Sequence, residues 1–560
     1  MLTRRSFLHK SALGAAALTT SSALTFAHEQ QHKPNIIFIL CDDMGYGDLG
    51  CFDHPDIKSP NLDGLASEGM KLTQCYAPAP VCSPARAGFM TGRIPQRTGI
   101  YDYIKKLSDT HLHTSELTIA ELLKSVGYET CFVGKWHLCG KFRELTSQPM
   151  PSDQGFDYYM ATENNAGPNH LNPGNFVRNG VKVGQIQGYS SDIIAAEALD
   201  WLQNKRDESK PYFLFVSFHS PHEYIKTAQE YKDMYSYNTV ADPLNHGAFP
   251  YRKYWGNITQ MDNAAGQVLS YLDTSNTKDS TFIMFTSDNG PETYVRYSGA
   301  FQSVGSTGGL RGRKLELYEG GIRVPGIIRW PGHVTAGSTS HEPLNGVDLL
   351  PTLCDISGAE IPTDRAVDGV SLLPVFSGNS LQRSTPLYWQ FDQAKVCEPF
   401  TVGEWPTCDD HAGEYNRAPT TVIRRGDWKL LAWKNNRTIE LYNLKDDPAE
   451  SRDLSSVETQ RAQDMLDALI KLKNEVSEEG RHNGVIIRDV KTLNSVGRKR
   501  INGSATIDLV SLAGRTLQSL HTRARTVNLQ RLNLPGGVFI VKVNGRFRQF
   551  AHTASILKVR

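Results

Sequence analysis

Four short runs of apolar residues lie within the first 290 residues, at 35–40, 129–133, 212–218 and 281–286. The runs are continuous rather than alternating, which is typical of strands buried on both faces of a parallel sheet. Helical periodicity lies between them, for example over 115–126 and 193–202. This strand–helix alternation predicts an α/β fold with a large mixed, mostly parallel sheet flanked by helices.

Each apolar run ends directly at a cluster of polar residues. Ligands of open α/β sheets bind beyond the carboxyl ends of the strands. We therefore expect these side chains to meet at one edge of the sheet. The clusters are Asp42-Asp43, Lys135-Trp136-His137, His219-Ser220-Pro221-His222 and Asp288-Asn289-Gly290.

The pattern changes after residue 385. Strand-like segments at 421–423, 428–433 and 438–442 precede an amphipathic helix over 457–476. Short strand patterns at 506–510, 527–529, 538–543 and 547–551, with Asn544-Gly545 as a hairpin turn, then predict a small β-sandwich. We expect a large first domain over 28–385, an α+β subdomain over 386–483 and a β-sandwich tail over 484–560.

The N-terminus resembles a twin-arginine export signal. Thr3-Arg4-Arg5-Ser6-Phe7-Leu8 precedes a small-residue apolar stretch that ends at Ala27. This stretch is short and weakly apolar for a spanning helix, although an uncleaved membrane anchor is the alternative. We expect residues 1–27 to be a signal peptide read by the export machinery, and the protein to be periplasmic, secreted or held at the cell surface.

The charge is distributed unevenly along the chain. Residues 481–560 contain fifteen Lys and Arg residues against Asp489 and Asp508, a net charge of +13, whereas the whole chain carries only +1. The first 480 residues therefore carry −12, and an acidic body with a basic tail indicates two modules. The tail is a candidate for cell-surface sorting or attachment, for holding a sulfated polyanion, or for a solvated module without a partner. We expect no nucleic-acid partner.

The nine cysteines show no zinc-binding spacing. After export, Cys397 and Cys408 are the favoured local disulfide pair. Cys82 stands apart because of the motif Cys82-Ser83-Pro84-Ala85-Arg86. Pro84 suits the first turn of a helix, and Cys82 and Arg86, four residues apart, would then share one face, with the cation beside the sulfur. A buried structural cysteine is the alternative.

The string that begins at Cys82 resembles the signature of the sulfatase family, in which a dedicated enzyme converts this cysteine to formylglycine. Ala85 stands where many members have Ser. The resemblance implies an alkaline-phosphatase-like fold, hydrolysis of sulfate esters and a formylglycine-generating enzyme as a partner. Further matching motifs are Asp42-Asp43-Met44-Gly45-Tyr46-Gly47-Asp48, Gly134-Lys135-Trp136-His137-Leu138, Ser287-Asp288-Asn289-Gly290, Leu310-Arg311-Gly312-Arg313-Lys314 and Leu441-Tyr442-Asn443-Leu444.

The ligand types at the strand ends predict a metal site. Asp42, Asp43, Asp288 and Asn289 offer hard oxygen atoms, which favour Ca²⁺ or Mg²⁺ over zinc. An isolated Asp pair is usually a solvated turn, but here both pairs follow buried strands. The resemblance favours calcium, with the group formed from Cys82 completing its coordination.

The cations and histidines have roles that the resemblance implies. Lys135 and Lys314 would stabilise the charge that develops as the S–O bond breaks, although a lone lysine is usually solvated. Lys135 and His137, two apart on an extended segment, should point the same way. His137 would help to deprotonate the second hydroxyl of hydrated formylglycine, and His222 would protonate the leaving alcohol. His219 is the competing candidate for the acid.

The resemblance is strongest to sulfatases that act on sugars, including galactose and N-acetylgalactosamine sulfates, so we expect a sulfated carbohydrate substrate. The expected pocket walls are 164–175, 292–306 and Trp389-Gln390-Phe391. Two alternatives stay open. One is a phosphate or phosphonate monoester hydrolase of the same superfamily, and the other is a non-catalytic glycan-binding surface protein with an unmodified Cys82.

Overall fold

The computed structural model describes residues 33–144, 148–236, 251–293, 300–392 and 418–483, together with short strands between 505 and 558. The export signal, the Cys397–Cys408 pair and the Asn544-Gly545 turn lie outside these residues and stay predictions. No helix among the described residues is both long enough and apolar enough to cross a membrane.

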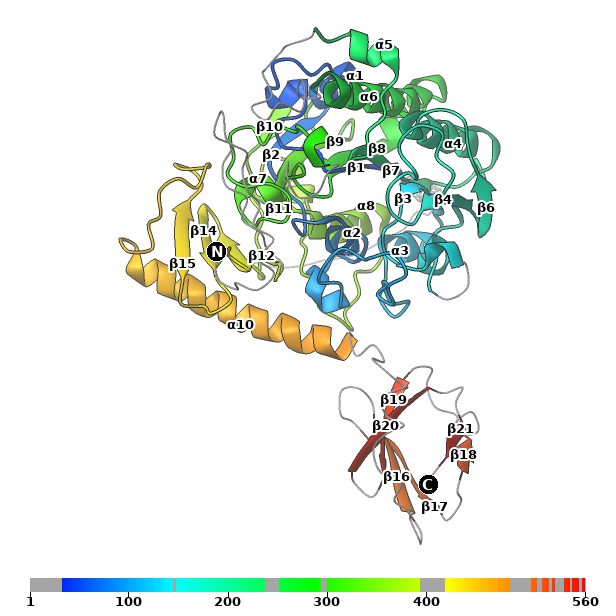
Figure 1. Cartoon of the computed structure of the whole chain (residues 1–560), viewed down its shortest axis with the longest axis vertical. Helices are drawn as coiled ribbons and strands as arrows, with labels where there is room; N and C mark the ends of the chain where they lie inside the picture. The colour runs from blue at the N-terminus through cyan, green and yellow to red at the C-terminus, as the bar shows by residue number, and fades with distance from the viewer. Residues whose placement is uncertain are drawn as a thin grey trace, which may run out of the picture. The chain divides into compact units, whose positions relative to one another are not determined.

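The main sheet contains eleven strands in the order β10-β2-β9-β8-β1-β7-β3-β4-β5-β6, with β11 beside β2 (Figure 1). The four apolar runs form its centre, as predicted. The strands are β1 Asn35–Asp42, β2 Met70–Tyr76, β3 Glu129–Lys135, β4 Tyr158–Thr162, β5 Phe176–Arg178, β6 Val181–Gly184, β7 Tyr212–Pro221, β8 Thr281–Ser287, β9 Arg323–Arg329, β10 Ser338–Ser340 and β11 Leu344–Asn345.

The central strands are parallel and the sheet is mixed toward its edges. β1 pairs in parallel with β7 and β8, and β3 pairs in parallel with β7 and β4. β9 is antiparallel to both β8 and β2, and β5 is antiparallel to β4 and β6. β7 and β8 are buried along their whole length, which explains their continuous apolar sequences. The predicted fold class is confirmed.

Helices cover both faces of the sheet (Figure 1). Alternate residues of β1 point to opposite faces. Phe38 packs in the core that includes α2, α3 and α8, whereas Ile37 and Ile39 pack in the core that includes α1, α4 and α6. The helices are α1 Pro60–Glu68, α2 Cys82–Thr91, α3 Ile119–Ser125, α4 Ser190–Asn204, α5 Gln229–Asp233, α6 Tyr251–Thr274, α7 Glu319–Ile322, α8 Leu349–Ser357 and α9 Leu373–Phe376.

The helix expected over 115–126 starts later than predicted. Thr118 is its N-cap, with the Thr118 hydroxyl accepting a hydrogen bond from the Glu121 N–H at 3.2 Å. The Glu121 carboxylate accepts one from the Thr118 N–H at 2.8 Å. This reciprocal capping box satisfies the first free N–H groups of the helix and so places its start after Thr118.

The smaller C-terminal sheet runs β12-β13-β14-β15 and is antiparallel. Its strands are β12 Leu387–Gln390, β13 Thr421–Arg425, β14 Trp428–Ala432 and β15 Ile439–Asn443. Helix α10, Thr459–Asn483, extends seven residues past the predicted end at Val476. Met465 and Leu469 of α10 pack against Ile423 and Leu430 of the sheet.

The expectation that Trp389-Gln390-Phe391 forms a pocket wall is wrong. Trp389 and Phe391 are each 1% exposed and belong to a core cluster. The Trp389 indole donates to the Ala77 carbonyl oxygen at 2.8 Å, and its ring lies 5.4 Å from that of Tyr76. These aromatic residues join the small sheet to the main sheet, because large apolar side chains gain more by burial than by lining a polar site.

The tail is an all-β segment, as predicted. Its strands form one sheet in the order β17-β16-β19-β20 and a second of β18 and β21, all antiparallel. The strands are β16 Ala505–Val510, β17 Thr516–Thr522, β18 Thr526–Asn528, β19 Val538–Val543, β20 Arg546–His552 and β21 Ile556–Lys558. The predicted domain limits stay predictions.

A buried ion cluster also connects the two sheets. Lys429 of β14 lies 2.9 Å from a Glu319 carboxylate oxygen and 2.8 Å from one of Glu450. Burial opposes the ionisation of Glu319, but Lys429 and Arg323 outweigh it and lower the pKa of Glu319 to about 2. The ammonium group of Lys429 therefore balances carboxylates that are out of reach of water.

Replacing Lys429 with Met should destabilise the protein by about 3–5 kcal/mol, because the buried Glu450 carboxylate loses its cation and Glu319 keeps only the more distant Arg323, at 3.5 Å. Chemical denaturation followed by tryptophan fluorescence measures this change. Lys210→Met is the matched control, since Lys210 pairs with Asp207 at an exposed position. Equal denaturation midpoints for the two variants would contradict the role given to Lys429.

Candidate active site

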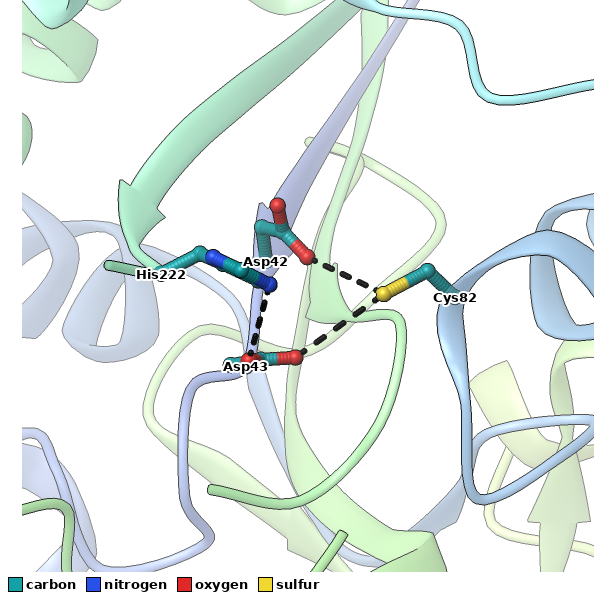
Figure 2. Close-up of side chains that lie close together, drawn as sticks. All are labelled: Asp42, Asp43, Cys82 and His222. Atoms are coloured by element: carbon teal, nitrogen blue, oxygen red, sulfur yellow. Dashed lines mark hydrogen bonds and ion pairs between the residues drawn. The ribbon is translucent and has the colours of Figure 1, made fainter. Parts of the chain in front are cut away.

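The polar residues that follow the four central strands meet at one edge of the sheet, and Figure 2 shows Asp42, Asp43 and His222 there with Cys82. Asp42 ends β1 and Lys135 ends β3, while His222 and Asp288 directly follow β7 and β8. The parallel register brings these ends level, with Asp42 opposite Pro221 and Cys41 opposite Ser287. The expected convergence is therefore present, and all four side chains are buried.

The two adjacent aspartates reach the same point because the strand geometry breaks between them. In a regular strand, neighbouring side chains point to opposite faces. Asp43 instead has a left-handed φ of 66°. Its carboxylate turns toward Cys82, where the Asp42 and Asp43 Oδ1 atoms lie 3.4 and 4.0 Å from the sulfur.

Cys82 is the first residue of α2 and is 2% exposed. Besides the two aspartates, its sulfur contacts the Lys135 ammonium nitrogen at 3.5 Å. Burial and the nearby Asp288 raise the pKa of the Cys82 thiol well above its usual value. The unmodified side chain is therefore a neutral thiol, which is a poor nucleophile.

Arg86 lies one turn after Cys82, as predicted, and one of its guanidinium nitrogens lies 3.9 Å from Asp42 Oδ1, the carboxylate oxygen that contacts the sulfur. The guanidinium also donates two hydrogen bonds to Asp288 Oδ2, at 3.0 and 2.8 Å. It also donates to the Lys135 carbonyl oxygen and to the Ser217 hydroxyl, both at 2.7 Å. Arg86 therefore holds the ends of three strands together, and Lys135 is the cation in contact with the sulfur.

Two lysines pair with the two aspartates. Lys135 lies 2.5 Å from Asp42 Oδ2, and Lys314 lies 2.6 Å from Asp43 Oδ2. Burial would raise the pKa of Asp43, but Lys314 and His222 outweigh burial and lower it. Lys314 also lies 3.2 Å from Glu292. Both lysines predicted from the sequence are thus buried parts of the site.

The donor set fits a hard cation. The Oδ1 atoms of Asp42 and Asp43 converge on the sulfur, and Asn289 Oδ1 is buried without a hydrogen-bond partner among the described residues. Burial and the neighbouring Asp42 raise the pKa of Asp288 to about 6, although Arg86 and Lys135 act against this shift. An orphaned amide oxygen beside crowded carboxylates is the arrangement that Ca²⁺ or Mg²⁺ relieves.

The two competing histidines lie in different surroundings. His222 Nε2 lies 3.5 Å from Asp43 Oδ2, and its Nδ1 lies 2.5 Å from the Glu223 carbonyl oxygen. Burial lowers the pKa of His222 to about 3, with Asp43 opposing the shift and Lys314 adding to it. His219 Nε2 instead bonds the Thr162 hydroxyl at 2.7 Å. The geometry favours His222, the residue chosen from the sequence.

The extended geometry expected between Lys135 and His137 ends at Lys135. His137 has a left-handed φ of 55°, so simple alternation does not orient it. Its Nε2 lies 3.1 Å from the Ile104 carbonyl oxygen, and its buried Nδ1 has no partner among the described residues. Burial and Lys135 lower the pKa of His137 well below its usual value, so the ring is neutral.

Sequence reasoning did not single out three residues that the structure places beside this site. The Asn165 side-chain oxygen accepts a hydrogen bond from Lys135 at 3.1 Å, and its nitrogen lies 3.1 Å from His222 Nδ1. Glu223 and Glu292 lie with Asp43 and His222 in a second buried cluster of ligand atoms. The only sequence feature that pointed to Asn165 and Glu292 was their position in loops predicted to form pocket walls.

Two family models match the chain. The model described as "Sulfatase" covers residues 34–359, and the model described as "N-sulphoglucosamine sulphohydrolase, C-terminal" covers residues 313–479. Together they span the main sheet, the small sheet and most of α10. The first alone covers more than half of the chain.

Curated relatives include human steryl-sulfatase, with 31% identity over an alignment of 431 residues that covers 63% of this chain and 71% of the relative. The N-acetylgalactosamine-6-sulfatase of Canis lupus familiaris has 31% identity over an alignment of 398 residues that covers 67% of this chain and 72% of the relative.

Among solved structures, Ps i-CgsB in complex with k-i-k-neocarrahexaose has a TM-score of 0.67 and 26% identity, covering 82% of this chain and 96% of that chain. The phosphonate monoester hydrolase of Agrobacterium radiobacter has a TM-score of 0.56 and 20% identity, covering 79% and 96%. At 20% identity, the likeness to the phosphonate monoester hydrolase shows a shared fold and nothing more. With the buried site at the strand ends and the match over residues 34–359, this chain belongs to the sulfatase family, which hydrolyses sulfate esters.

Proposed function

We propose that this protein removes sulfate from sulfated sugars of a polysaccharide, with formylglycine made from Cys82 as its nucleophile and Ca²⁺ as its metal ion. The observation that carries the proposal is the position of Cys82. Cys82 is the first residue of α2, and its side chain faces two aspartates and a lysine at the carboxyl edge of the sheet. Such a site holds a charged ester against a nucleophile while excluding water.

The modification would supply what the thiol lacks. Hydrated formylglycine has two hydroxyls on one carbon, so one can attack sulfur and the other can release the sulfate afterwards. The motif Cys82-Ser83-Pro84-Ala85-Arg86 is the part of the chain that a formylglycine-generating enzyme would read. Twin-arginine export, which carries folded proteins, would allow this step to precede crossing of the membrane.

Asp42, Asp43, Asp288 and Asn289 would hold the metal, with residue 82 beside them. A bound Ca²⁺ would supply positive charge that polarises the sulfate oxygens and favours ionisation of the nucleophile. The hard oxygen ligands and the orphaned Asn289 oxygen support this choice. Arg86 would keep Asp288 in place, because two guanidinium nitrogens donate hydrogen bonds to one oxygen of the Asp288 carboxylate.

The protein's own cations would bind the sulfate group. Lys135 and Lys314 would offer their ammonium groups to oxygens that gain charge as the S–O bond breaks. His222 would donate a proton to the leaving oxygen from Nε2. Its imidazole is neutral in the free protein, but the negative charge of a bound sulfate ester beside it would favour the protonated ring. His137, neutral and with an unpartnered nitrogen, would accept the proton of the second hydroxyl.

Asn165 would act as a positioning residue. Its amide contacts both Lys135 and the His222 ring, and it also lies 3.4 Å from the Glu223 carbonyl oxygen. The Asn165 carbonyl oxygen accepts a hydrogen bond from Asn175 at 2.8 Å, which fixes the loop. The Asn165 amide would therefore hold Lys135, which binds the sulfate, and His222, the acid, in a fixed position relative to each other.

A sugar substrate is supported by the N-acetylgalactosamine-6-sulfatase relatives and by the likeness to Ps i-CgsB, solved with k-i-k-neocarrahexaose. Export to the periplasm, the medium or the cell surface suits a polymer too large to import. The basic tail would attach the protein to the surface or hold a polyanion.

Cys82→Ala should abolish hydrolysis of sulfated sugars and of p-nitrophenyl sulfate, because no other group at that position can attack sulfur. The protein should be produced with and without a formylglycine-generating enzyme, and mass spectrometry of the peptide that contains Cys82 should track activity. An intact thiol in fully active protein would contradict the proposal. A higher kcat/KM on p-nitrophenyl phosphate or a phenylphosphonate ester than on the sulfate would favour the phosphoester alternative.

Removal of divalent ions with EDTA should abolish activity, and Ca²⁺ should restore it, because the carboxylates need a cation at their centre. Asn289→Ala should raise the Ca²⁺ concentration required for half-maximal recovery. Asn204→Ala, on the exposed face of α4, is the control. Full activity after exhaustive chelation would rule out a metal role for Asp42, Asp43 and Asp288.

Asn165→Ala should lower kcat by about 10–100-fold, since a hydrogen bond to a charged group contributes about 1.5–3 kcal/mol. The pH profile of kcat should also shift, because His222 loses a neighbour that fixes its ring. Asn204→Ala again serves as the control, and thermal unfolding checks that both variants fold. An unchanged pH profile with a raised KM alone would mean that Asn165 only contacts substrate.

A further inference from the structure

The segment that follows β7 leads from the reaction centre to the surface. His222 and Glu223 are 7% and 1% exposed, Tyr224 is 49% exposed, Ile225 is fully buried and Lys226 is exposed. The backbone is held in place, because the Tyr224 carbonyl oxygen accepts a hydrogen bond from the His170 N–H at 3.3 Å. Tyr224 therefore presents a large ring to solvent only two residues from the candidate acid.

Three lysines from different elements gather beside this segment. Lys226 follows β7, Lys232 belongs to α5 and Lys253 lies in the first turn of α6 (Figure 1). The Thr227 hydroxyl donates to the Lys253 carbonyl oxygen at 2.7 Å, and Asn257 of α6 donates to the Lys226 carbonyl oxygen at 3.5 Å. The three lysines and Tyr224 are called the lysine strip below.

The charges on the strip repel one another. Burial lowers the pKa of Lys253 to about 8, and the neighbouring Lys226 and Lys232 add to this shift. The Lys253 ammonium group donates to a neutral partner, the Gln302 side-chain oxygen, at 2.8 Å. The nearby carboxylate of Asp233 is already paired with Arg252 at 3.0 Å. Positive charges held together in this way favour the binding of an anion.

A chain of contacts connects the strip to the active site. Gln302, which contacts Lys253, is followed by Ser303, whose hydroxyl donates to the Glu223 carboxylate at 3.1 Å. Glu223 in turn directly follows His222. A ligand with its reacting sulfate at Cys82 and its leaving oxygen at His222 would thus extend outward over Tyr224 and the lysines.

We propose that Tyr224, Lys226, Lys232 and Lys253 form a subsite for the anionic sugar unit adjoining the one that loses its sulfate. The tyrosine ring offers an apolar face to the sugar, and the lysines bind its sulfate or carboxylate. The substrate is then an oligosaccharide with at least two anionic groups rather than a singly sulfated sugar. This inference rests on the proposed function, since it names the substrate class of the same site.

Binding to the Cys82→Ala protein tests the subsite without turnover. Isothermal titration should use sulfated hexasaccharides from carrageenan and from chondroitin sulfate, each with its desulfated form. Lys226→Ala combined with Lys253→Ala should weaken binding of the tighter sulfated hexasaccharide by about tenfold, and should reduce the dependence of binding on salt. Lys182→Ala with Lys210→Ala, an equal change of charge at exposed positions elsewhere, should leave binding unchanged.

Equal affinities of the two double variants, or no binding of any sulfated hexasaccharide, would overturn the subsite. Kinetics on protein with its native Cys82 separate this inference from the proposed function. The loss of kcat/KM in the Lys226→Ala, Lys253→Ala variant should be about tenfold greater for the hexasaccharide than for p-nitrophenyl sulfate. Equal losses would also overturn the subsite. Failure of the unmutated protein to hydrolyse any sulfate ester would instead defeat the proposed function, while the titration still tests binding.

Discussion

The structure depends on the balance of charge among buried groups at the carboxyl edge of the main sheet. An ionised group removed from water is costly unless an opposite charge and hydrogen bonds compensate it. Here three carboxylates at strand ends meet three cations, and the partners of one pair, Asp43 and Lys314, are 271 positions apart in sequence. The pairs are Asp42 with Lys135, Asp43 with Lys314, and Asp288 with Arg86.

This balance explains the unusual surroundings of Cys82. Its sulfur lies where two carboxylate oxygens and one ammonium group converge. Burial, with the nearby Asp288, raises the pKa of the thiol, which favours its neutral form. The formylglycine proposed at position 82, ionised next to the proposed metal ion, would make better use of these surroundings than the neutral thiol does.

The groups at the reaction centre and the groups expected to contact the sugar lie on different parts of the fold. Apart from Lys314, which lies in a buried turn, the groups that would bind or transfer the sulfate lie at strand ends and on the first turn of α2, where packing holds them rigidly. Asn165, Tyr224 and Lys226 lie on connecting segments around that centre. Loops are where related enzymes differ in what they bind, so these residues are where the choice of sugar is expected to reside.

The sequence by itself determined the architecture and most of the centre. Continuous apolar runs identified the four central strands, and the polar clusters after them identified the edge at which the site forms. These inferences succeeded because they depend on periodicity and on the topology of parallel sheets, both of which are local or general.

Only the tertiary structure decided the partners of each side chain. The helical spacing from Cys82 to Arg86 was correct, yet it did not reveal that Asp288, more than 200 positions away, would attract the guanidinium. Strand alternation failed at Asp43 and His137, where left-handed backbone conformations turn the side chains. Trp389 looked like a pocket wall but is buried between two sheets. Contacts between residues distant in sequence settle such questions, because each charged or aromatic group adopts the orientation that best satisfies partners brought to it by the whole fold.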